Sequence, residues 1–199
     1  RKVRSERGAP WLQFDLSALI KAIPSLIYGA SVTLPITVLA IAIGLVIGFI
    51  TGLARVWPNI FFRSISSVYI ELIRGTPLLV QIFIVYFGLP ALGLNLDPFV
   101  AGMIAMGINS GAYIGEIVRG GIESIAKGQM EAARSLGLTY WQAMRYVILP
   151  QSLVRILPAL GNEFIALLKD SSLVSTIAIA ELTRSGQIII TRTFKSFEI

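Results

Sequence analysis

Charged residues are unevenly spaced along the chain, and the gaps between them predict membrane-spanning helices. Residues 22–54 carry no charge, and further uncharged stretches separate Arg74 from Asp97 and Asp97 from Glu116. Each gap approaches or exceeds the ~20 apolar residues that a helix needs to cross the hydrocarbon core of a bilayer. The pattern therefore predicts three spanning helices, near residues 26–54, 67–90 and 97–118.

The second half of the chain mixes charged and apolar stretches. Residues 119–155 carry too many charges for a lipid-facing segment: Arg119, Glu123, Lys127, Glu131, Arg134, Arg145 and Arg155. The apolar stretch that follows is interrupted by Glu163, Lys169 and Asp170, so we expect a fourth span that faces protein or water. Residues 185–199 are too few to cross a bilayer, and we expect them to open a fifth span that continues past residue 199.

The Lys and Arg residues of the loops predict the orientation of the chain, because positive loops remain in the cytoplasm. Arg55 and Arg63 lie between the first two spans, residues 88–97 carry no Lys or Arg, and residues 119–155 carry five. This distribution places the first linker and the 119–155 loop inside and residues 88–97 outside. The N-terminus then lies outside, although its positive charges run against the rule: Arg1, Lys2, Arg4 and Arg7.

The domain organisation follows from these assignments. We expect an extracytoplasmic or interfacial segment at residues 1–25 and one transmembrane domain at residues 26–199, which includes a cytoplasmic loop at residues 119–150. The length of 199 residues allows one domain.

Composition agrees with a membrane protein and removes several classes of chemistry. The chain is 55% hydrophobic and 14% charged, with a mean hydropathy of +0.76, whereas a soluble domain carries about 25% charged residues. It has no His and no Cys, which excludes Ser-His and Cys-His nucleophilic pairs and cysteine metal sites. We expect no catalytic residue, no metal site and no nucleic acid partner.

Two of the predicted spans carry glycines at four-residue spacing. Small residues in this pattern let helix backbones approach closely in lipid, where packing must replace the hydrophobic effect. We interpret them as a helix-packing surface, with a pore lining as the alternative. The glycines are Gly44, Gly48 and Gly52 in the first span, and Gly107, Gly111 and Gly115 in the third.

The 119–155 loop contains a short helix followed by a turn and a second helix. Residues 129–136 are good helix formers, and Gly137 stands where a left-handed residue ends a helix. Thr139 and Gln142 have the spacing of a capping box, which starts the next helix. On the first helix a small apolar face stands beside two charges and suits docking into a groove on another protein. That face consists of Ala132, Ala133 and Leu136, beside Glu131 and Arg134.

These residues resemble the cytoplasmic loop of permease subunits of bacterial ABC importers. The shared pattern is E-A-A, a Gly four residues after the last Ala, a β-branched residue ten further on, and L-P. Its positions here are Glu131, Ala132, Ala133, Gly137, Val147, Leu149 and Pro150, with Val147 standing where Ile is usual. Residues 69–90, 111–129 and 167–182 are similar to stretches typical of the polar amino acid uptake branch of that family.

The resemblance implies an all-α, type I importer-like bundle of about five spans in the bacterial inner membrane, with an outward N-terminus. It implies a second permease protomer, identical or not, two cytoplasmic ATP-binding subunits and an extracytoplasmic amino acid-binding protein. It also implies that residues 128–137 form the coupling helix, which inserts into a cleft on the ATPase. The coupling residues would be Gly128, Glu131, Ala132, Ala133, Arg134, Leu136 and Gly137.

The chain itself lacks a nucleotide site. A phosphate-binding loop requires G-x-x-x-x-G-K-[ST], and Lys21, Lys127 and Lys169 do not stand in that context. We therefore expect ATP and Mg²⁺ to bind the partner ATPase and no cofactor to bind this chain.

Polar groups at bilayer depth are costly, which makes them candidates for binding the substrate. They are Asn109 and Ser110 in the third span, and Asn162 and Glu163 in the fourth. Glu163 either accepts the cationic side chain or α-amino group of an amino acid, or forms a structural pair with Lys169, Arg119 or another cation. Asn109 and Ser110 either contact the ligand or form interhelical hydrogen bonds.

The other intramembrane charges have a structural interpretation. Glu71 and Arg74, like Glu116 and Arg119, are three residues apart on a helix, so each pair can compensate its own charge. Lys169 and Asp170 are expected to fix helix packing.

The sequence therefore favours an ATP-driven importer of polar amino acids that works by alternating access. Glu163 favours the basic ones, arginine, lysine or histidine, and neutral ones such as glutamine are the alternative. A non-transporting membrane scaffold, or an intramembrane enzyme that uses Lys169 with Ser171 or Ser172, is the competing class. A secondary transporter is less favoured, because the sequence shows no internal repeat.

Overall fold

The computed structural model describes residues 15–199, which are almost entirely helical and contain no strand. Predictions about residues 1–14, which include Arg1, Lys2, Arg4 and Arg7, lie outside this range. The longest helix, α1 (Leu16–Arg55), has 40 residues and spans about 60 Å at 1.5 Å per residue. It begins ten residues before the predicted start at residue 26, because the helix runs through Lys21 without interruption.

The span predicted at residues 67–90 is not one continuous helix. The structure has α2 (Ile60–Arg74) and α3 (Leu78–Phe83), and their axes are bent by 100° at the break between them. A π-helical turn (Ile84–Gly88) and a 3₁₀ turn (Leu89–Leu92) extend α3. Pro77 explains the break, since it lacks a backbone N–H and keeps Thr76 out of the helical region.

The remaining helices follow the predicted order. They are α4 (Pro98–Glu123), α5 (Lys127–Ser135), α6 (Tyr140–Ala143), α7 (Leu149–Asp170) and α8 (Leu182–Thr193). A π-helical turn (Met144–Ile148) joins α6 to α7, and a 3₁₀ helix (Ser171–Ile177) follows α7. Among the described residues, α1 alone is long and apolar enough to cross a membrane by itself, and α2 with α3 passes as one bent segment.

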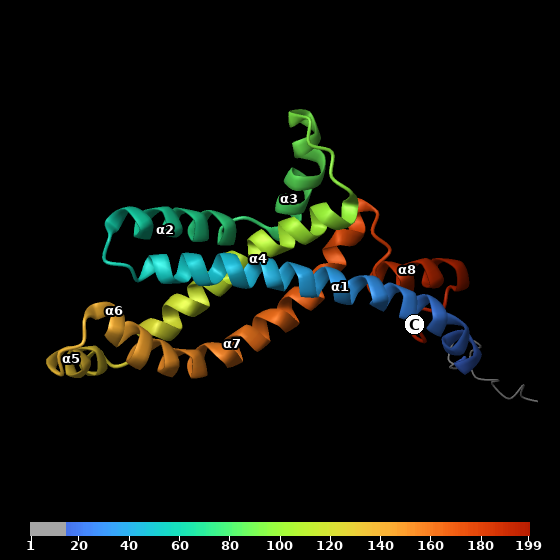
Figure 1. The fold of residues 1–199 in the computed structure, drawn as a ribbon. Helices are drawn as coiled ribbons and strands as arrows, with labels where there is room; N and C mark the ends of the chain where they lie inside the picture. Colours follow the sequence, from blue (N-terminus) through green and yellow to red (C-terminus); the bar gives the residue numbers. More distant parts are fainter. Residues whose placement is uncertain (1–14) are drawn as a thin grey trace, which may run out of the picture.

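Figure 1 shows how these helices are arranged. The long helices α1, α4 and α7 cross one another, α2 runs beside the second half of α1, and α3 projects away from the bundle. The loop helices α5 and α6 lie at one end of the molecule, and α8 lies at the other end beside the start of α1. A polar cavity lies between the break after α2, α4 and α7.

The glycine pattern forms the interface between α1 and α4, which confirms its interpretation as a packing surface. A Cβ atom on Gly48 would lie 2.4 Å from Ile114 Cγ2, and one on Gly107 would lie 2.8 Å from Ile43 Cβ. Neither distance leaves room for a side chain, so the two backbones approach as closely as glycine permits.

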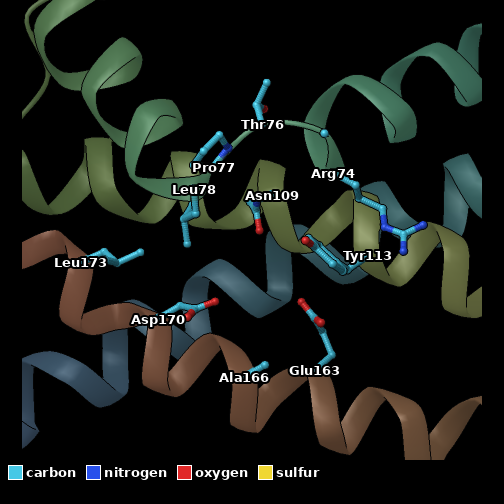
Figure 2. Close-up of a pocket in the computed structure, with 11 residues that line it drawn as sticks. Arg74, Thr76, Pro77, Leu78, Asn109, Tyr113, Glu163, Ala166, Asp170 and Leu173 are labelled. Carbon is cyan, nitrogen blue, oxygen red and sulfur yellow. The ribbon is translucent and has the colours of Figure 1, made fainter.

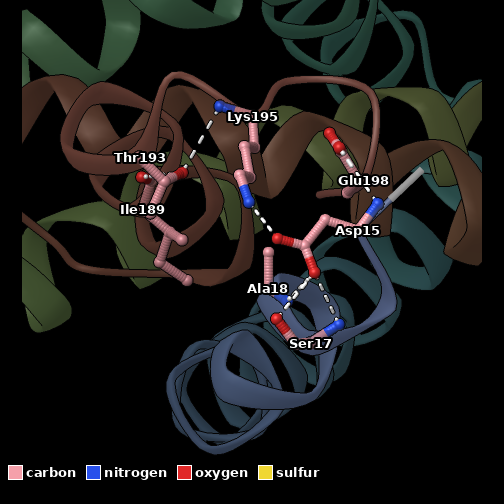
Figure 3. Close-up of polar contacts among 7 residues, drawn as sticks. All are labelled: Asp15, Ser17, Ala18, Ile189, Thr193, Lys195 and Glu198. Carbon is pink, nitrogen blue, oxygen red and sulfur yellow. Dashed lines mark hydrogen bonds and ion pairs between the residues drawn. The ribbon is translucent and has the colours of Figure 1, made fainter. Parts of the chain in front are cut away.

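The two ends of the described chain meet beside α8. Asp15 caps α1 by accepting hydrogen bonds from Ser17 N at 2.9 Å and Ala18 N at 3.3 Å, and it pairs with Lys195 (Figure 3). The Lys195 ammonium holds the pKa of Asp15 well below its usual range. Buried Glu181 caps α8 through the backbone N–H groups of Thr183 and Arg184.

Candidate functional site

An open cavity of about 560 Å³ lies where the break between α2 and α3 faces α4 and α7. Its polar lining comes from three elements, as Figure 2 shows: Arg74 and Thr76 at the break, Asn109 and Tyr113 on α4, and Glu163 and Asp170 on α7. Leu78, Ala166 and Leu173 add apolar surface. A cavity with apolar walls and a few converging polar groups is the usual form of a small-molecule site.

Gln81 holds the α2–α3 break in place. Its buried side chain donates hydrogen bonds to Ile73 O at 2.8 Å and Thr76 Oγ1 at 2.7 Å, and it accepts one from Asn109 Nδ2 at 3.0 Å. The bond to Ile73 O replaces the usual helical donor four residues on, because that residue is Pro77 and has no N–H. Gln81 thereby ties the wall formed by the break to the wall formed by α4.

Glu163 faces the cavity from α7 and is held from α4. Ser110 donates a hydrogen bond from Oγ to Glu163 Oε1 at 2.8 Å, and Figure 2 shows the carboxylate pointing toward Asn109 and Tyr113. Within residues 15–199 Glu163 forms no ion pair, with Lys169, Arg119 or any other cation. Asp170 is seven residues on, about 10 Å further along the same side of the helix.

Arg74 brings a positive charge to the same cavity. The predicted pair of Glu71 with Arg74 is wrong: Glu71 pairs with Arg55 at 3.9 Å, and the Arg74 guanidinium lies 5.2 Å from the centre of the Tyr113 ring. The two residues at the end of α2 diverge because Arg74 reaches α4 while Glu71 reaches the end of α1. The predicted pair of Glu116 with Arg119 is confirmed, and Arg119 also pairs with Glu123.

The four candidate substrate residues differ in position. Asn109 and Glu163 line the cavity, Ser110 is fully buried behind it and contacts Glu163, and Asn162 is exposed outside the lining. The sequence interpretation missed four polar lining residues, Arg74, Thr76, Tyr113 and Asp170. Helical spacing offered a signal for two of them, because Tyr113 is four residues after Asn109 and Asp170 is seven after Glu163.

The coupling loop has the predicted local structure. Gly137 follows α5 with φ 87°, a left-handed conformation that ends the helix, and Thr139 with Gln142 forms the capping box. Leu136 is 82% exposed, and the side chains of Glu131, Ala132 and Arg134 are exposed as well. Ala133 is buried against the rest of the loop, so it supports α5 from inside and is not part of an exposed apolar face.

Two aromatic residues join this loop to the end of α1. The rings of Trp57 and Trp141 lie 4.2 Å apart between centres, and Tyr140 Oη donates to Val56 O at 3.5 Å. The α1–α2 linker and the coupling loop are therefore packed together at one end of the molecule. In the described part of the chain, no group of three or more acidic residues is placed to hold a metal ion.

A helical bundle with a polar cavity and an exposed loop helix is consistent with a membrane permease. Residues 44–196 match the family described as the binding-protein-dependent transport system inner membrane component, and the chain belongs to that family. The fold class predicted from the sequence, a type I ABC importer permease, is confirmed.

Several curated relatives transport amino acids. The chain is 51% identical over 190 residues to the glutamine transport system permease protein GlnP of Escherichia coli (strain K12), covering 94% of this chain and 87% of that protein. It is 42% identical over 174 residues to the arginine transport system permease protein ArtQ of Bacillus subtilis (strain 168), covering 87% and 80%.

Solved structures give the same result. A chain from the crystal structure of an amino acid ABC transporter with histidines is 48% identical, with a TM-score of 0.86 and coverage of 94% of this chain and 87% of that one. The MetNI methionine ABC transporter in an inward-facing conformation is 22% identical, with a TM-score of 0.69 and coverage of 86% and 82%, and supports the fold alone. The chain is an ABC transporter permease for amino acids.

Proposed function

We propose that this chain imports polar α-amino acids through the cavity at the α2–α3 break, with basic amino acids favoured. The observation that carries the proposal is that Arg74 and Glu163, opposite in charge, line one cavity. An α-amino acid carries a carboxylate and an ammonium group within a few ångströms of each other. Charges buried in a membrane protein require partners of opposite sign, and this pair of side chains suits both groups.

Each charge has its own role in this proposal. Arg74 receives the α-carboxylate, since a guanidinium presents several N–H donors in a planar fork. Glu163 receives the α-ammonium through the oxygen that Ser110 leaves free. Thr76 and Asn109 supply further polar contacts on the wall opposite α7.

Asp170 decides the preference for basic side chains. The lining has two carboxylates and one guanidinium, so a neutral zwitterion satisfies Arg74 and Glu163 and leaves Asp170 alone. A cationic side chain reaching about 10 Å along α7 would pair with Asp170. A relative named for arginine and a related structure described with histidines support the preference for basic amino acids.

A neutral amide is the second candidate, because the relative at 51% identity is named for glutamine. The side-chain amide of glutamine would donate a hydrogen bond to Asp170. Both candidates use the same cavity and differ in how strongly Asp170 binds the side chain of the substrate.

The energy for transport comes from partner chains in this proposal. Two cytoplasmic ATP-binding subunits bind ATP and Mg²⁺ and hydrolyse ATP, and the exposed residues at the end of α5 dock into them. Their closure moves the coupling loop and alternates the cavity between an outward-open and an inward-open state. A second permease protomer and an extracytoplasmic amino acid-binding protein complete the importer in the bacterial inner membrane. The N-terminus lies outside and the loop inside.

A substrate-stimulated ATPase assay tests the proposal. The permease is reconstituted in proteoliposomes with its ATP-binding subunits and binding protein, and arginine, lysine, histidine and glutamine are compared. Stimulation with the lowest half-maximal concentration for a basic amino acid supports the preferred assignment, and the lowest value for glutamine supports the second. Absence of stimulation and of uptake for every polar amino acid contradicts the proposal and favours a non-transporting scaffold.

A further inference from the structure

A second cavity, of about 350 Å³, lies between the end of α1, α2 and α4, toward the coupling loop. Three arginines and one glutamate line it with two serine hydroxyls: Arg55, Arg63, Arg119, Glu123, Ser64 and Ser67. Its lining carries two net positive charges, from three arginines less one glutamate. The amino acid cavity has the opposite sign, with Arg74 against Glu163 and Asp170.

Arg63 is the group in this cavity that is free to bind a ligand. Arg55 pairs with Glu71, and Arg119 pairs with Glu116 and Glu123. The Arg63 guanidinium makes no hydrogen bond or ion pair with any other residue in the range 15–199. An arginine beside two hydroxyls in a concave site has the donors that a carboxylate needs.

The two cavities lie along the same faces of the same two helices. On α2, Ser67 is four residues and Arg74 eleven residues after Arg63, so all three lie on one side of the helix. Arg63 and Ser67 line the second cavity and Arg74 lines the first, and about 16 Å of helix separates Arg63 from Arg74.

The face of α4 shows the same continuity. Tyr113 lines the first cavity and Glu123 the second, with Glu116 between them on the same side of the helix. Glu116 pairs with Arg119, which lines the second cavity. Charged side chains of both signs therefore lie along this face between the two cavities.

We propose that the arginine-lined cavity is a second amino acid site, in which Arg63 holds the α-carboxylate of the substrate on its way out toward the coupling loop. This inference rests on the proposed function. An amino acid leaving the first cavity exchanges Arg74 for Arg63 as the partner of its carboxylate. Its ammonium exchanges Glu163 for Glu123, which lines the second cavity. Each position offers both signs, so neither charge of the zwitterion crosses the bundle unpaired.

The sequence contains no cysteine, so a cysteine introduced into the cavity is the only thiol among residues 1–199 and can be labelled specifically. The variant Ser67→Cys, in the full complex, is reacted with methanethiosulfonate reagents that carry a negative or a positive charge. We expect the negative reagent to react faster, and Arg63→Gln to reduce its advantage by about two- to fivefold, the range for one partly exposed charge pair. Ser64→Cys provides a second labelling position if Ser67→Cys does not fold.

Ile65→Cys is the matched control, since Ile65 is 54% exposed on the opposite side of α2. We expect lipid to protect it from both charged reagents. Equal labelling of Ile65→Cys and Ser67→Cys, or no preference for the negative reagent, contradicts a basic cavity.

Protection from labelling tests the ligand. We expect an amino acid that stimulates the ATPase to slow labelling at Ser67→Cys at least twofold, and the corresponding amine without the carboxylate to give no protection. Protection by phosphatidylglycerol in the vesicle and none by the amino acid would overturn the inference in favour of a lipid headgroup. Stimulated ATPase without protection refutes the second site alone, whereas absence of any stimulation refutes the proposed function.

Discussion

Ser110 on α4 donates a hydrogen bond to Glu163 on α7, with 2.8 Å between Ser110 Oγ and Glu163 Oε1. The bond joins α4 to α7 beside the cavity that Glu163 lines, and it fixes the direction of the carboxylate. Because Ser110 is fully buried and Glu163 faces the cavity, one residue positions the other. The assignment of Glu163 to the α-ammonium and of Asp170 to the side chain leads to the first prediction.

Neutralising the two carboxylates of α7 should separate their roles. We expect Asp170→Asn to raise the arginine concentration that gives half-maximal ATPase stimulation about tenfold, because one charge-assisted hydrogen bond contributes about 1.5 kcal/mol. The corresponding concentration of glutamine should change less than twofold. Glu163→Gln should raise both by similar factors. Asn162→Ala is the control, because Asn162 is exposed outside the cavity. An equal effect of Asp170→Asn on both substrates would remove the role given to Asp170.

Gln81 should matter for every substrate, because it fixes the break that forms one wall of the cavity. Gln81→Leu removes the bonds to Ile73, Thr76 and Asn109 and leaves buried polar groups without partners, at a cost of about 1–3 kcal/mol. We expect a lower unfolding temperature in detergent and weaker stimulation by basic and neutral amino acids alike. Gln187→Leu, at an exposed position on α8, should change neither quantity. Unaltered stability of Gln81→Leu would contradict the bracing role.

Much of this architecture could be predicted because it follows from local rules. The uncharged stretch before Arg55 predicted a helix, and the spacing of glycines such as Gly48 and Gly107 predicted a helix-packing surface. Thr139 with Gln142 predicted the start of α6. Each depends on neighbours within about one or two turns of helix or on the requirement for an apolar span. The coupling loop was predictable for the same reason.

The amino acid cavity was only half predictable, because it depends on tertiary geometry. The spacing of charged residues carries no information on the helix break at Pro77, so it did not predict the bend beside the cavity. The spacing of Glu71 and Arg74 permits a pair, but Arg74 instead lies over Tyr113 on another helix. Asn162 and Glu163 are adjacent in sequence, and successive residues of a helix point about 100° apart, so only one of them faces the cavity.

The α1–α4 interface should not tolerate a larger residue at Gly48. A Cβ atom there would lie 2.4 Å from Ile114 Cγ2 and 3.0 Å from Gly111 O, and such overpacking costs about 1–3 kcal/mol. We expect Gly48→Ala to lower the unfolding temperature measured in detergent. Gly120→Ala, on α4 with nothing within 4 Å of the added atom, should be neutral or stabilising by up to about 1 kcal/mol. Equal stability of the two variants would contradict the close approach.

The pair of Asp15 and Lys195 should make stability depend on pH. Because Lys195 lowers the pKa of Asp15 in the folded chain, the contribution is complete above the unfolded value of about 3.9 and is lost as the pH falls below it. Asp15→Asn keeps a side chain that caps α1 and removes the charge. We expect this variant to unfold at a lower temperature than the unchanged chain at pH 7, and the difference to shrink at pH 3. A difference that is independent of pH would assign the effect to capping.

The exposed end of α5 should be required for docking the ATP-binding subunits and dispensable for folding. Leu136 is 82% exposed, so Leu136→Asp should leave the unfolding temperature unchanged and reduce copurification of the ATPase at least tenfold, as expected for an apolar side chain that inserts into a groove. Leu92→Asp is the matched control, because Leu92 is 77% exposed at the end of the α3 extension, and it should copurify normally. Gly137→Ala should reduce docking by a different route, since φ 87° costs a residue with a Cβ atom roughly 1–2 kcal/mol and shifts the end of α5. Full copurification with Leu136→Asp would place the docking surface elsewhere on the loop, and equal losses with Leu92→Asp would show a general defect in the permease.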